Sequence, residues 1–357
     1  MTTALDPTST TPAAAEGGGA KIPSVPDTMP AIAADRYGSA DVLELRTVPV
    51  PTPAADQVLI RVRAAGVGRG VWHLMTGTPL VIRLGFGLRA PKRPVLGMEV
   101  SGTVEAVGSE VTRFAPGDEV FGMGLSTYAA FAVAPEAKLA LRPEGLTPVE
   151  AAAMCDSAST ALQAVRDHAQ VSAGQRVLVL GGSGGVGSYA VQIAKAQGAH
   201  VTATARTPKV EFVRGLGADE VIDHRTTDPT DLPAGAPRYD AIIDIGGNNP
   251  LRRLRGVLAP EGTLVIVGGE QAGGGLLAGF GRQIWASIRS LTTRQTLKTF
   301  IAAEDHAHLE DLATLVAAGD VRPSVDRTYP LAETAAALHA LEAGEVRGKL
   351  VIEVDPA

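Results

Sequence analysis

Cysteine is nearly absent from this chain of 357 residues, which contains only Cys155. One thiol forms no internal disulfide and supplies no multi-cysteine zinc site, so a disulfide scaffold is excluded. We expect Cys155 to be a small buried apolar residue rather than a reactive thiol. Aromatic residues are also scarce at 4%, so the core must be built from Ala, Val, Leu and Ile.

Three further features are missing. Lys and Arg (32) do not outnumber Asp and Glu (38), and the net charge of −6 argues against a nucleic-acid partner. No stretch reaches the ~18 apolar residues that a membrane-spanning helix needs. Residues 1–20 lack the basic and apolar regions of a secretory signal, so we expect a soluble, cytoplasmic protein.

The length suggests about two domains. Residues 1–28 are rich in Thr, Pro, Ala and Gly, and we interpret them as a disordered tail. Residues 29–150 contain short strand candidates with frequent turn signals, at 58–63 and 100–107, which are typical of a β-barrel. A final strand at 350–354 is expected to return to this first domain, so that residues 325–357 belong to it.

Residues 151–324 alternate between apolar strands and helices. Near-continuous apolar strands of this kind indicate a parallel sheet with both faces covered. The expected strands are 176–180, 200–204, 221–223, 241–244 and 263–267, and the expected helices are 148–163, 188–197 and 209–216.

A glycine-rich turn follows the first of these strands. Gly182, Gly184 and Gly187 form the pattern G-x-G-x-x-G between a strand and a helix, the context that makes it typical of dinucleotide binding. The glycines permit a tight turn, close approach of backbone N–H groups to a pyrophosphate, and close helix–strand packing. The alternative is a plain strand–helix turn. The expected cofactor-binding residues here are Gly182, Ser183, Gly184, Gly185, Val186 and Gly187.

The same turn also reads G-x-S-x-G, the nucleophile elbow of serine hydrolases. Ser183 would be the nucleophile, with Asp244 and either His306 or His308 as its partners. No His-Gly-Gly motif precedes the turn, and an elbow does not explain Gly187. We therefore favour the dinucleotide site.

The second strand of this domain ends without the carboxylate that usually binds the ribose of NAD. Arg206 stands in that place, Lys209 lies one turn later, and the Thr204 hydroxyl is nearby. These groups suit a 2′-phosphate, so we expect NADPH rather than NADH. The alternative is that Arg206 is a solvated surface charge. His224, Gly246 and Gly268 follow later strands and are also expected to bind the cofactor.

Several segments together resemble the zinc-free quinone oxidoreductase group of the medium-chain dehydrogenases/reductases, which is related to NAD(P)-dependent alcohol dehydrogenases. The matching segments are PVLGMEVSGTV (94–104), RFAPGDEVFG (113–122), STALQ (159–163), the glycine turn with AVQIAK (190–195), and GAD (217–219). The resemblance implies an α/β chain with a GroES-like β-barrel domain, a Rossmann domain with a doubly wound parallel sheet at 151–324, a cleft between them, and often a homodimer.

Relatives that use zinc carry a Cys, a His and a later Cys as ligands. This chain has Gly68, Met98 and Cys155 at or near those positions, so we expect no zinc. Without a metal, the simplest chemistry is hydride delivery from NADPH to a quinone or an α,β-unsaturated carbonyl compound. A zinc-independent carbonyl reductase or alcohol dehydrogenase is the alternative, and a non-enzymatic NADPH-binding protein is the third hypothesis.

The resemblance also implies site residues. The turn that contains Gly68, Trp72 and His73 matches the cleft segment of the family, in which Asn or Asp commonly stands at the Gly68 position. Thr160 matches a position near the nicotinamide, and Tyr128 lies in a segment that often borders the substrate. We expect catalytic roles for Thr160, His73 and Tyr128, and a substrate pocket of Gly68, Trp72 and Tyr128. The alternatives are that Thr160 bonds its own helix, that Trp72 belongs to the core and that His73 binds a backbone carbonyl.

Two further features of the sequence concern the cofactor site and the surface of the protein. Family comparison puts Lys349, which directly precedes the predicted final strand, near the cofactor pyrophosphate. Residues 271–303 combine a glycine run with Leu, Ile, Trp and Arg. We favour a lid or a dimer surface for this segment over a membrane-surface helix.

Overall fold

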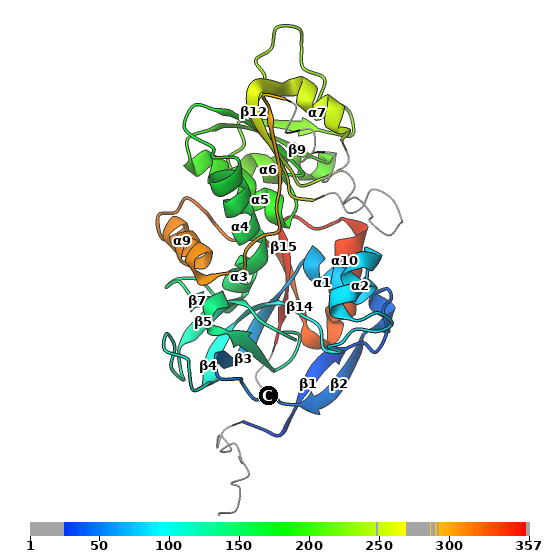
Figure 1. The fold of residues 1–357 in the computed structure, drawn as a ribbon, viewed down its shortest axis with the longest axis vertical. Coiled ribbons are helices and arrows are strands. Elements are labelled where there is room, and N and C mark those ends of the chain that lie inside the picture. The colour runs from blue at the N-terminus through cyan, green and yellow to red at the C-terminus, as the bar shows by residue number, and fades with distance from the viewer. Residues whose placement is uncertain (1–24, 248, 269–285, 287–289, 291–292, 355–357) are drawn as a thin grey trace, which may run out of the picture.

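The structure is a computed structural model, and it describes residues 25–247, 249–268, 286, 290 and 293–354. Two lobes are built around two separate sheets (Figure 1). The α/β fold class, with one GroES-like and one Rossmann-like sheet, is confirmed. Residues 1–24 of the expected tail and most of segment 271–303 lie outside the described residues.

The lower lobe in Figure 1 contains a seven-stranded sheet. Its strands run in the order β14-β15-β3-β4-β5-β7, and β6 pairs with β3. The predicted strands 58–63 and 100–107 lie within β3 and β4, and the predicted last strand, β15, pairs antiparallel with β3 as expected. The bounds are β3 Gln57–Val67, β4 Glu99–Val107, β5 Glu119–Met123, β6 Phe131–Pro135, β7 Leu139–Leu141, β14 Val325–Pro330 and β15 Lys349–Glu353. Strands β1 Thr28–Ala33 and β2 Glu44–Pro49 pair with each other in a separate two-stranded sheet.

The upper lobe contains a parallel six-stranded sheet in the order β10-β9-β8-β11-β12-β13. Numbered along the chain, this order is 3-2-1-4-5-6, the arrangement of dinucleotide-binding sheets. The five strands predicted in this domain are all present. Their bounds are β8 Arg176–Leu180, β9 His200–Ala205, β10 Glu220–Asp223, β11 Tyr239–Asp244 and β12 Leu258–Ile266, with β13 Thr296–Thr299 at the edge.

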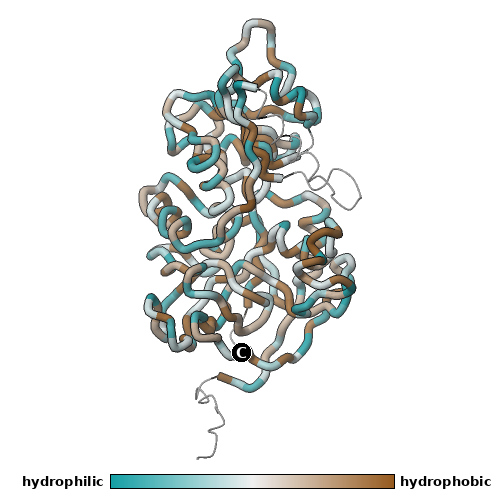
Figure 2. The backbone as a smooth tube through the Cα atoms, in the orientation of Figure 1, coloured by the Kyte–Doolittle hydropathy of each residue, from teal (hydrophilic) through white to brown (hydrophobic). Residues whose placement is uncertain are grey.

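The core of the upper lobe lies on both faces of its sheet. Along β8, Val177 and Val179 join the cluster under α5, whereas Leu178 and Leu180 join the opposite cluster under α7. Alternate residues of a strand point to opposite faces, so a strand covered on both sides must be apolar throughout. Figure 2 shows hydrophobic segments along the centre of this lobe, with hydrophilic ones toward its outer rim.

Helices cover the sheets and fill the junction between them. In Figure 1, α4 and α5 stand near the middle of the molecule. Helix α9 packs against α4 and β7, and α10 lies beside α1, to which it is joined by the hydrogen bond from Trp72 to Glu342. The bounds are α1 Arg69–Thr76, α2 Arg83–Phe86, α3 Pro148–Ala152, α4 Cys155–Leu162, α5 Gly185–Ala196, α6 Val210–Gly215, α7 Leu251–Val257, α9 His306–Ala317 and α10 Thr334–Ala343.

The prediction of one continuous helix over 148–163 is wrong in its continuity. It is divided into α3 and α4, with a turn at Ala153 and Met154. The two pieces serve different neighbours, because α3 contacts β3 and β4 whereas α4 packs against α5. Within the described residues, no helix is long and apolar enough to cross a membrane.

Candidate active site

The glycine turn joins β8 to α5, and its glycines differ in what surrounds them. A Cβ on Gly187 would lie 2.0 Å from the carbonyl oxygen of Gly181, and a Cβ on Gly182 would lie 3.0 Å from the Cβ of Ala203. A Cβ on Gly184 would meet nothing closer than 3.7 Å. Gly187 therefore permits helix–strand contact, whereas the surface over Gly184 is open to a ligand.

Helix α5 begins at Gly185 and presents its first turn to this open surface. The N–H groups of Gly185, Val186 and Gly187 precede the first helical bond, which runs from Ser188 N–H to the carbonyl of Gly184 at 2.9 Å. Such N–H groups and the helix dipole favour an anionic ligand. The turn therefore suits the pyrophosphate of a dinucleotide.

Thr204, a predicted cofactor ligand, holds the turn itself. Its hydroxyl accepts a hydrogen bond from Gly181 N–H at 2.9 Å, and its carbonyl accepts from Gly182 N–H at 2.9 Å. Its side chain is buried, so its evident task is to fix the first two glycines.

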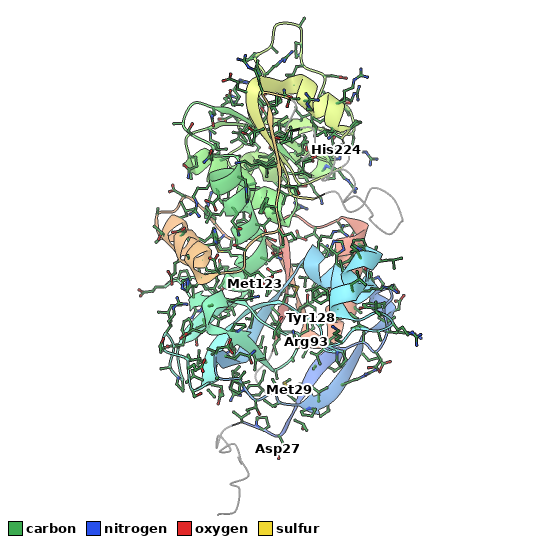
Figure 3. The ribbon with its side chains drawn as sticks, in the orientation of Figure 1. Asp27, Met29, Arg93, Met123, Tyr128 and His224 are labelled. Carbon is green, nitrogen blue, oxygen red and sulfur yellow. The ribbon has the colours of Figure 1, made fainter. Side chains whose placement is uncertain are left out.

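A group of cations gathers where β9 and β10 end. Arg206 and His224 are exposed there, and Figure 3 shows His224 in the upper lobe. Burial lowers the pKa of His224, and the nearby Arg206 lowers it further. Lys209 is buried and donates to the carbonyls of Gly344 and Val346 at 2.8 and 2.6 Å, so most of its donor capacity is used inside the protein. Arg206 is therefore the predicted phosphate ligand that is most accessible.

The ends of β11 and β12 also meet the turn. Gly246 N–H donates to the carbonyl of Leu180 at 3.1 Å, and a Cβ on Gly181 would lie 3.3 Å from Gly246 N. A Cβ on Gly268 would lie 2.4 Å from the carbonyl oxygen of Ile245. Both predicted glycines therefore lie at the carboxyl edge of the sheet. Close backbone packing requires Gly268, whereas a Cβ on Gly246 would meet nothing closer than 3.8 Å.

Lys349 lies at the junction of the two lobes. Its neighbour Gly348 donates its N–H to the carbonyl of Ser183 at 2.9 Å, which ties β15 to the glycine turn. The Lys349 ammonium donates to Glu99 Oε1 at 2.6 Å, and both side chains are only 2% exposed. Sequence reasoning predicted Lys349 but not Glu99, whose partner stands 250 positions away in the chain.

Thr160 and Asp156 lie one helical turn apart on α4. The Thr160 hydroxyl is 3.4 Å from Asp156 Oδ1, and Thr160 is 9% exposed. Asp156 Oδ2 faces the cleft segment, 3.8 Å from where a Cβ on Gly68 would lie. Thr160 was predicted, but Asp156 carries no motif that could have identified it.

The structure argues against direct substrate contact by Tyr128. Its side chain is completely buried in the lower lobe, and its hydroxyl donates to the carbonyl of Gly66 at 3.1 Å (Figure 3). Burial raises the pKa of this phenol, and the Glu99 carboxylate raises it further. Tyr128 thus supports the cleft segment from behind.

Trp72 and His73 are on α1, and both have partners in the protein. The Trp72 indole donates to Glu342 at 2.6 Å, and His73 Nδ1 lies 2.5 Å from the carbonyl oxygen of Thr78. For His73 this matches the structural alternative of a histidine that binds a backbone carbonyl.

The positions that correspond to zinc ligands in relatives do not suit a metal here. Gly68 has no side chain, and Met98 offers only a thioether. Cys155 is 1% exposed, its sulfur points to the carbonyls of Ala151 and Val100 at 3.4 and 3.6 Å, and burial raises its pKa. Among the described residues, no group of three or more His, Cys, Asp or Glu side chains could hold a metal ion. The donors present therefore do not fit a catalytic zinc.

The hydrolase alternative gains no support from the expected partners of Ser183. The Asp244 carboxylate accepts from Gly247 N–H at 3.0 Å. The His308 ring nitrogens lie 2.8 Å from Asp305 and 3.2 Å from Asp167, on the side of α9. These contacts use Asp244 and His308 elsewhere, and the other candidate base, His306, stands at the first position of the same helix, α9.

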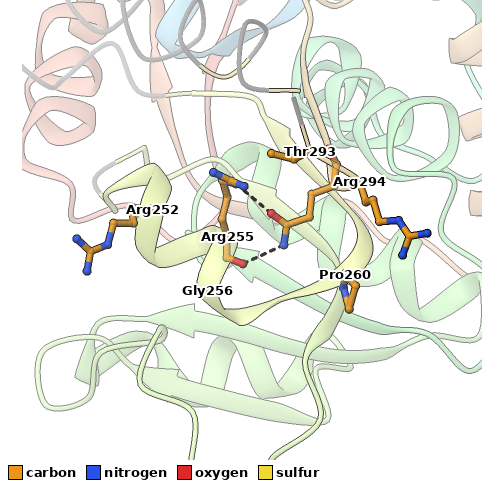
Figure 4. Close-up of a pocket in the computed structure, with 7 residues that line it drawn as sticks. Arg252, Arg255, Gly256, Pro260, Thr293 and Arg294 are labelled. Carbon is orange, nitrogen blue, oxygen red and sulfur yellow. Dashed lines mark hydrogen bonds between the residues drawn. The ribbon is translucent and has the colours of Figure 1, made fainter. Parts of the chain in front are cut away.

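A hollow away from the glycine turn is lined by arginines of α7 and of the segment before β13 (Figure 4). Arg255 and Gln295 hydrogen-bond each other there, while Arg252 and Arg294 point in different directions. Because these guanidinium groups do not converge, we assign it no ligand.

Two family models match the chain. An alcohol dehydrogenase GroES-like domain matches residues 54–144, and a zinc-binding dehydrogenase domain matches residues 216–352. The second description concerns the family, because the chain lacks a suitable ligand set among the residues described above.

Named relatives cover almost the whole chain. The chloroplast envelope quinone oxidoreductase homolog of Arabidopsis thaliana is 33% identical over 88% of this chain and 95% of its own length. The mitochondrial NAD(P)H oxidoreductase RTN4IP1 of Bos taurus is 32% identical over 91% of this chain and 89% of its own. The solved quinone oxidoreductase of Coxiella burnetii is 30% identical, with a TM-score of 0.80 over 92% of this chain and all of that one.

Proposed function

Because this chain belongs to the quinone oxidoreductase group of the medium-chain dehydrogenases/reductases and is an NAD(P)H-dependent oxidoreductase, we propose that it uses NADPH to reduce a quinone or an α,β-unsaturated carbonyl compound without a metal. One observation carries the choice of substrate. Gly68 and Met98 leave the cleft without donors for a Lewis acid, so the acceptor must already be electrophilic.

The residues of the glycine turn would hold the pyrophosphate, and Lys349 would border it through its stem, because its ammonium group is paired with Glu99. Lys349 Cδ lies 3.1 Å from where a Cβ on Gly185 would stand, so its stem borders the turn. When bound, a reduced nicotinamide supplies the hydride. Thr160 would donate a hydrogen bond to the carbonyl oxygen of the substrate and stabilise the negative charge that forms there.

A second candidate is a zinc-independent carbonyl reductase or alcohol dehydrogenase. A solved NAD-dependent alcohol dehydrogenase is 29% identical to this chain, with a TM-score of 0.76. Incubation of a substrate panel with NADPH separates the two. Loss of the conjugated C=C absorbance supports the first function, whereas formation of an alcohol from a saturated ketone supports the second.

The preference for NADPH is tested by Arg206→Ala. Loss of a charged hydrogen bond to the 2′-phosphate should weaken NADPH binding by about 1–3 kcal/mol and leave NADH nearly unchanged. Fluorescence titration of both coenzymes measures this. Arg214→Ala, on the exposed side of α6, is the matched control and should change neither affinity. A wild-type protein that binds NADH more tightly than NADPH would contradict the proposal.

Three other expectations remain predictions. We divide the chain into a GroES-like domain (29–150 and 325–357) and a Rossmann domain (151–324), and limited proteolysis can test the boundaries. A homodimer should appear in light scattering. The relatives above are named for the chloroplast and the mitochondrion, so the cytoplasmic location expected from the sequence needs cell fractionation.

A further inference from the structure

Where the two lobes meet, there is one more carboxyl group than there are cations to pair with it. Glu99 on β4, Asp156 on α4 and Lys349 on β15 surround Gly68, and we call these three residues the junction cluster. A Cβ on Gly68 would lie 2.9 Å from Glu99 Oε1, 3.2 Å from Lys349 Nζ and 3.8 Å from Asp156 Oδ2. The cluster therefore holds two carboxyl groups and one ammonium group at the edge of the cleft.

Within the cluster, Glu99 and Lys349 neutralise each other. Their 2.6 Å contact is fully buried, whereas Asp156 is only partly buried and has no salt bridge within the described residues. Two acids that share one cation keep a proton more readily than two separately paired acids. Burial raises the pKa of both acids. Direct contact with the ammonium favours the charged form of Glu99, so we assign the proton to Asp156, which lacks that contact.

The surroundings favour the neutral form of Asp156. Burial raises its pKa, Lys349 opposes this, the Glu304 carboxylate raises it again, and the bond from Thr160 lowers it. Glu304 itself pairs with Lys138 at 2.7 Å. Asp156 borders a small hollow together with Ser159, Ala303 and Glu304.

We propose that Asp156 is the acid that supplies the proton of the reduction, passing it through the Thr160 hydroxyl to the substrate. The inference rests on the proposed function. Hydride addition to the β-carbon of the substrate forms a C–H bond and moves the π electrons to the carbonyl oxygen. The Thr160 O–H then gives its proton to the enolate oxygen and takes the proton of Asp156, and the resulting enol tautomerises in water to the saturated ketone. The Asp156 carboxylate recovers a proton from water, so the substrate gains one hydride and one proton.

The contact between the two residues suits such a transfer. Thr160 and Asp156 are four positions apart on one helix and thus share a face. Their 3.4 Å separation is long for a hydrogen bond, and catalytic hydrogen bonds commonly tighten only when the substrate is bound. Gly68 leaves space on the cleft side of Asp156, where a larger residue would meet Glu99 and Lys349.

The main test is Asp156→Asn, which keeps the shape of the side chain and removes its acidic proton. With an α,β-unsaturated ketone as substrate, kcat should fall about 100-fold or more, because the strongly basic enolate oxygen loses its positioned acid. Reduction of a quinone should fall much less, because the hydroquinone anion takes its proton from water. The affinity for NADPH, measured without substrate, should stay within about twofold of the wild type.

Two readouts do not depend on turnover. The cofactor-free protein should show an infrared band of a protonated carboxyl group that disappears in Asp156→Asn. In Glu304→Gln a negative charge near Asp156 is lost, so this band should disappear at a lower pH than in the wild type. The wild-type rate should fall as pH rises through the same titration, and the fall should move to lower pH in Glu304→Gln.

The outcomes separate the inference from the proposed function. If wild-type protein reduces the ketone and Asp156→Asn does so at an unchanged rate with an unchanged pH profile, Asp156 is not the acid. An asparagine variant with altered NADPH binding and no infrared change would also overturn the inference, because Asp156 would then be structural. If the wild type reduces no electrophilic acceptor although it binds NADPH, the proposed function fails, while the infrared band still tests the protonation of Asp156.

Discussion

Two glycines of the glycine turn, Gly184 and Gly187, have different roles. Gly187 is fixed by the protein, because its missing side chain makes room for the Gly181 carbonyl. Gly184 has φ −87° and ψ −179°, a backbone conformation open to any residue, and its surroundings are empty. The fold therefore requires a glycine at Gly187 but not at Gly184, where we propose that the pyrophosphate of the cofactor binds.

The first prediction compares Gly187→Ala with Gly184→Ala. Gly187→Ala forces a methyl group against backbone and should lower the free energy of unfolding by about 1–3 kcal/mol. Gly184→Ala should leave stability unchanged but weaken NADPH binding at least tenfold, about 1.4 kcal/mol, because its methyl group occupies the place of a phosphate. Chemical denaturation and coenzyme titration measure the two effects. Equal loss of stability in both variants would contradict this assignment.

Helix α3, near the site, is stabilised by hydrogen bonds at its N-terminus. Helix α3 has only five residues, and an isolated helix of that length is not stable in water. A capping box compensates: the Thr147 hydroxyl accepts from Glu150 N–H at 3.2 Å, and Glu150 Oε2 accepts from Thr147 N–H at 2.9 Å. The cap also fixes where the chain passes from the first sheet toward α4, which carries Asp156 and Thr160.

The second prediction concerns this cap. Thr147→Ala should lower the free energy of unfolding by about 1 kcal/mol, because Glu150 N–H loses its acceptor. Urea denaturation measures the change. Thr112→Ala removes another exposed threonine side chain and should have almost no effect. A similar loss in both variants would show that the cap does not stabilise α3.

At the scale of the whole molecule, β15 connects the two lobes. It pairs with β3 in the lower sheet, Gly348 bonds the glycine turn, and Lys349 neutralises Glu99 inside the junction. Burial raises the pKa of Glu99, and Lys349 opposes that rise. The folded molecule thus depends on one buried cation at its centre.

The third prediction removes that cation. Lys349→Met leaves Glu99 unpaired and should lower the free energy of unfolding by about 3–5 kcal/mol at pH 7. The folded-state pKa of Glu99 then lies further above its unfolded value of about 4.3, so the folded state binds the proton more tightly. Stability should therefore be largest below the unfolded pKa and be lost as pH rises through the folded pKa, with a steeper slope than in the wild type.

Denaturation of Lys349→Met at several pH values measures this dependence. Adding Glu99→Gln to Lys349→Met removes the unpaired charge, so the double variant should recover part of the stability at pH 7 and lose the extra slope. A single variant whose stability does not change with pH would contradict the assigned role of the pair.

Local patterns in the sequence predicted the parts of the molecule that depend on neighbours in the chain. The strand at 176–180 has the predicted bounds, and the cofactor glycines follow from the strand–turn–helix order. The division between α3 and α4 was missed, because it depends on which elements each helix packs against: α3 contacts β3 and β4, whereas α4 contacts α5. Asp156 was missed for the same reason. The sequence does not show that it lies near Gly68 and Lys349, because only the fold brings these residues together.

The pairing of β15 with β3 also sets an order of events during synthesis. The ribosome completes the whole Rossmann sheet before it releases the segment that β3 needs as its neighbour. During synthesis the GroES-like half therefore stays incomplete on one side of β3, whereas the Rossmann half can already bury its hydrophobic core. Closure of the junction, and with it the burial of Glu99, is consequently the last step in making the enzyme.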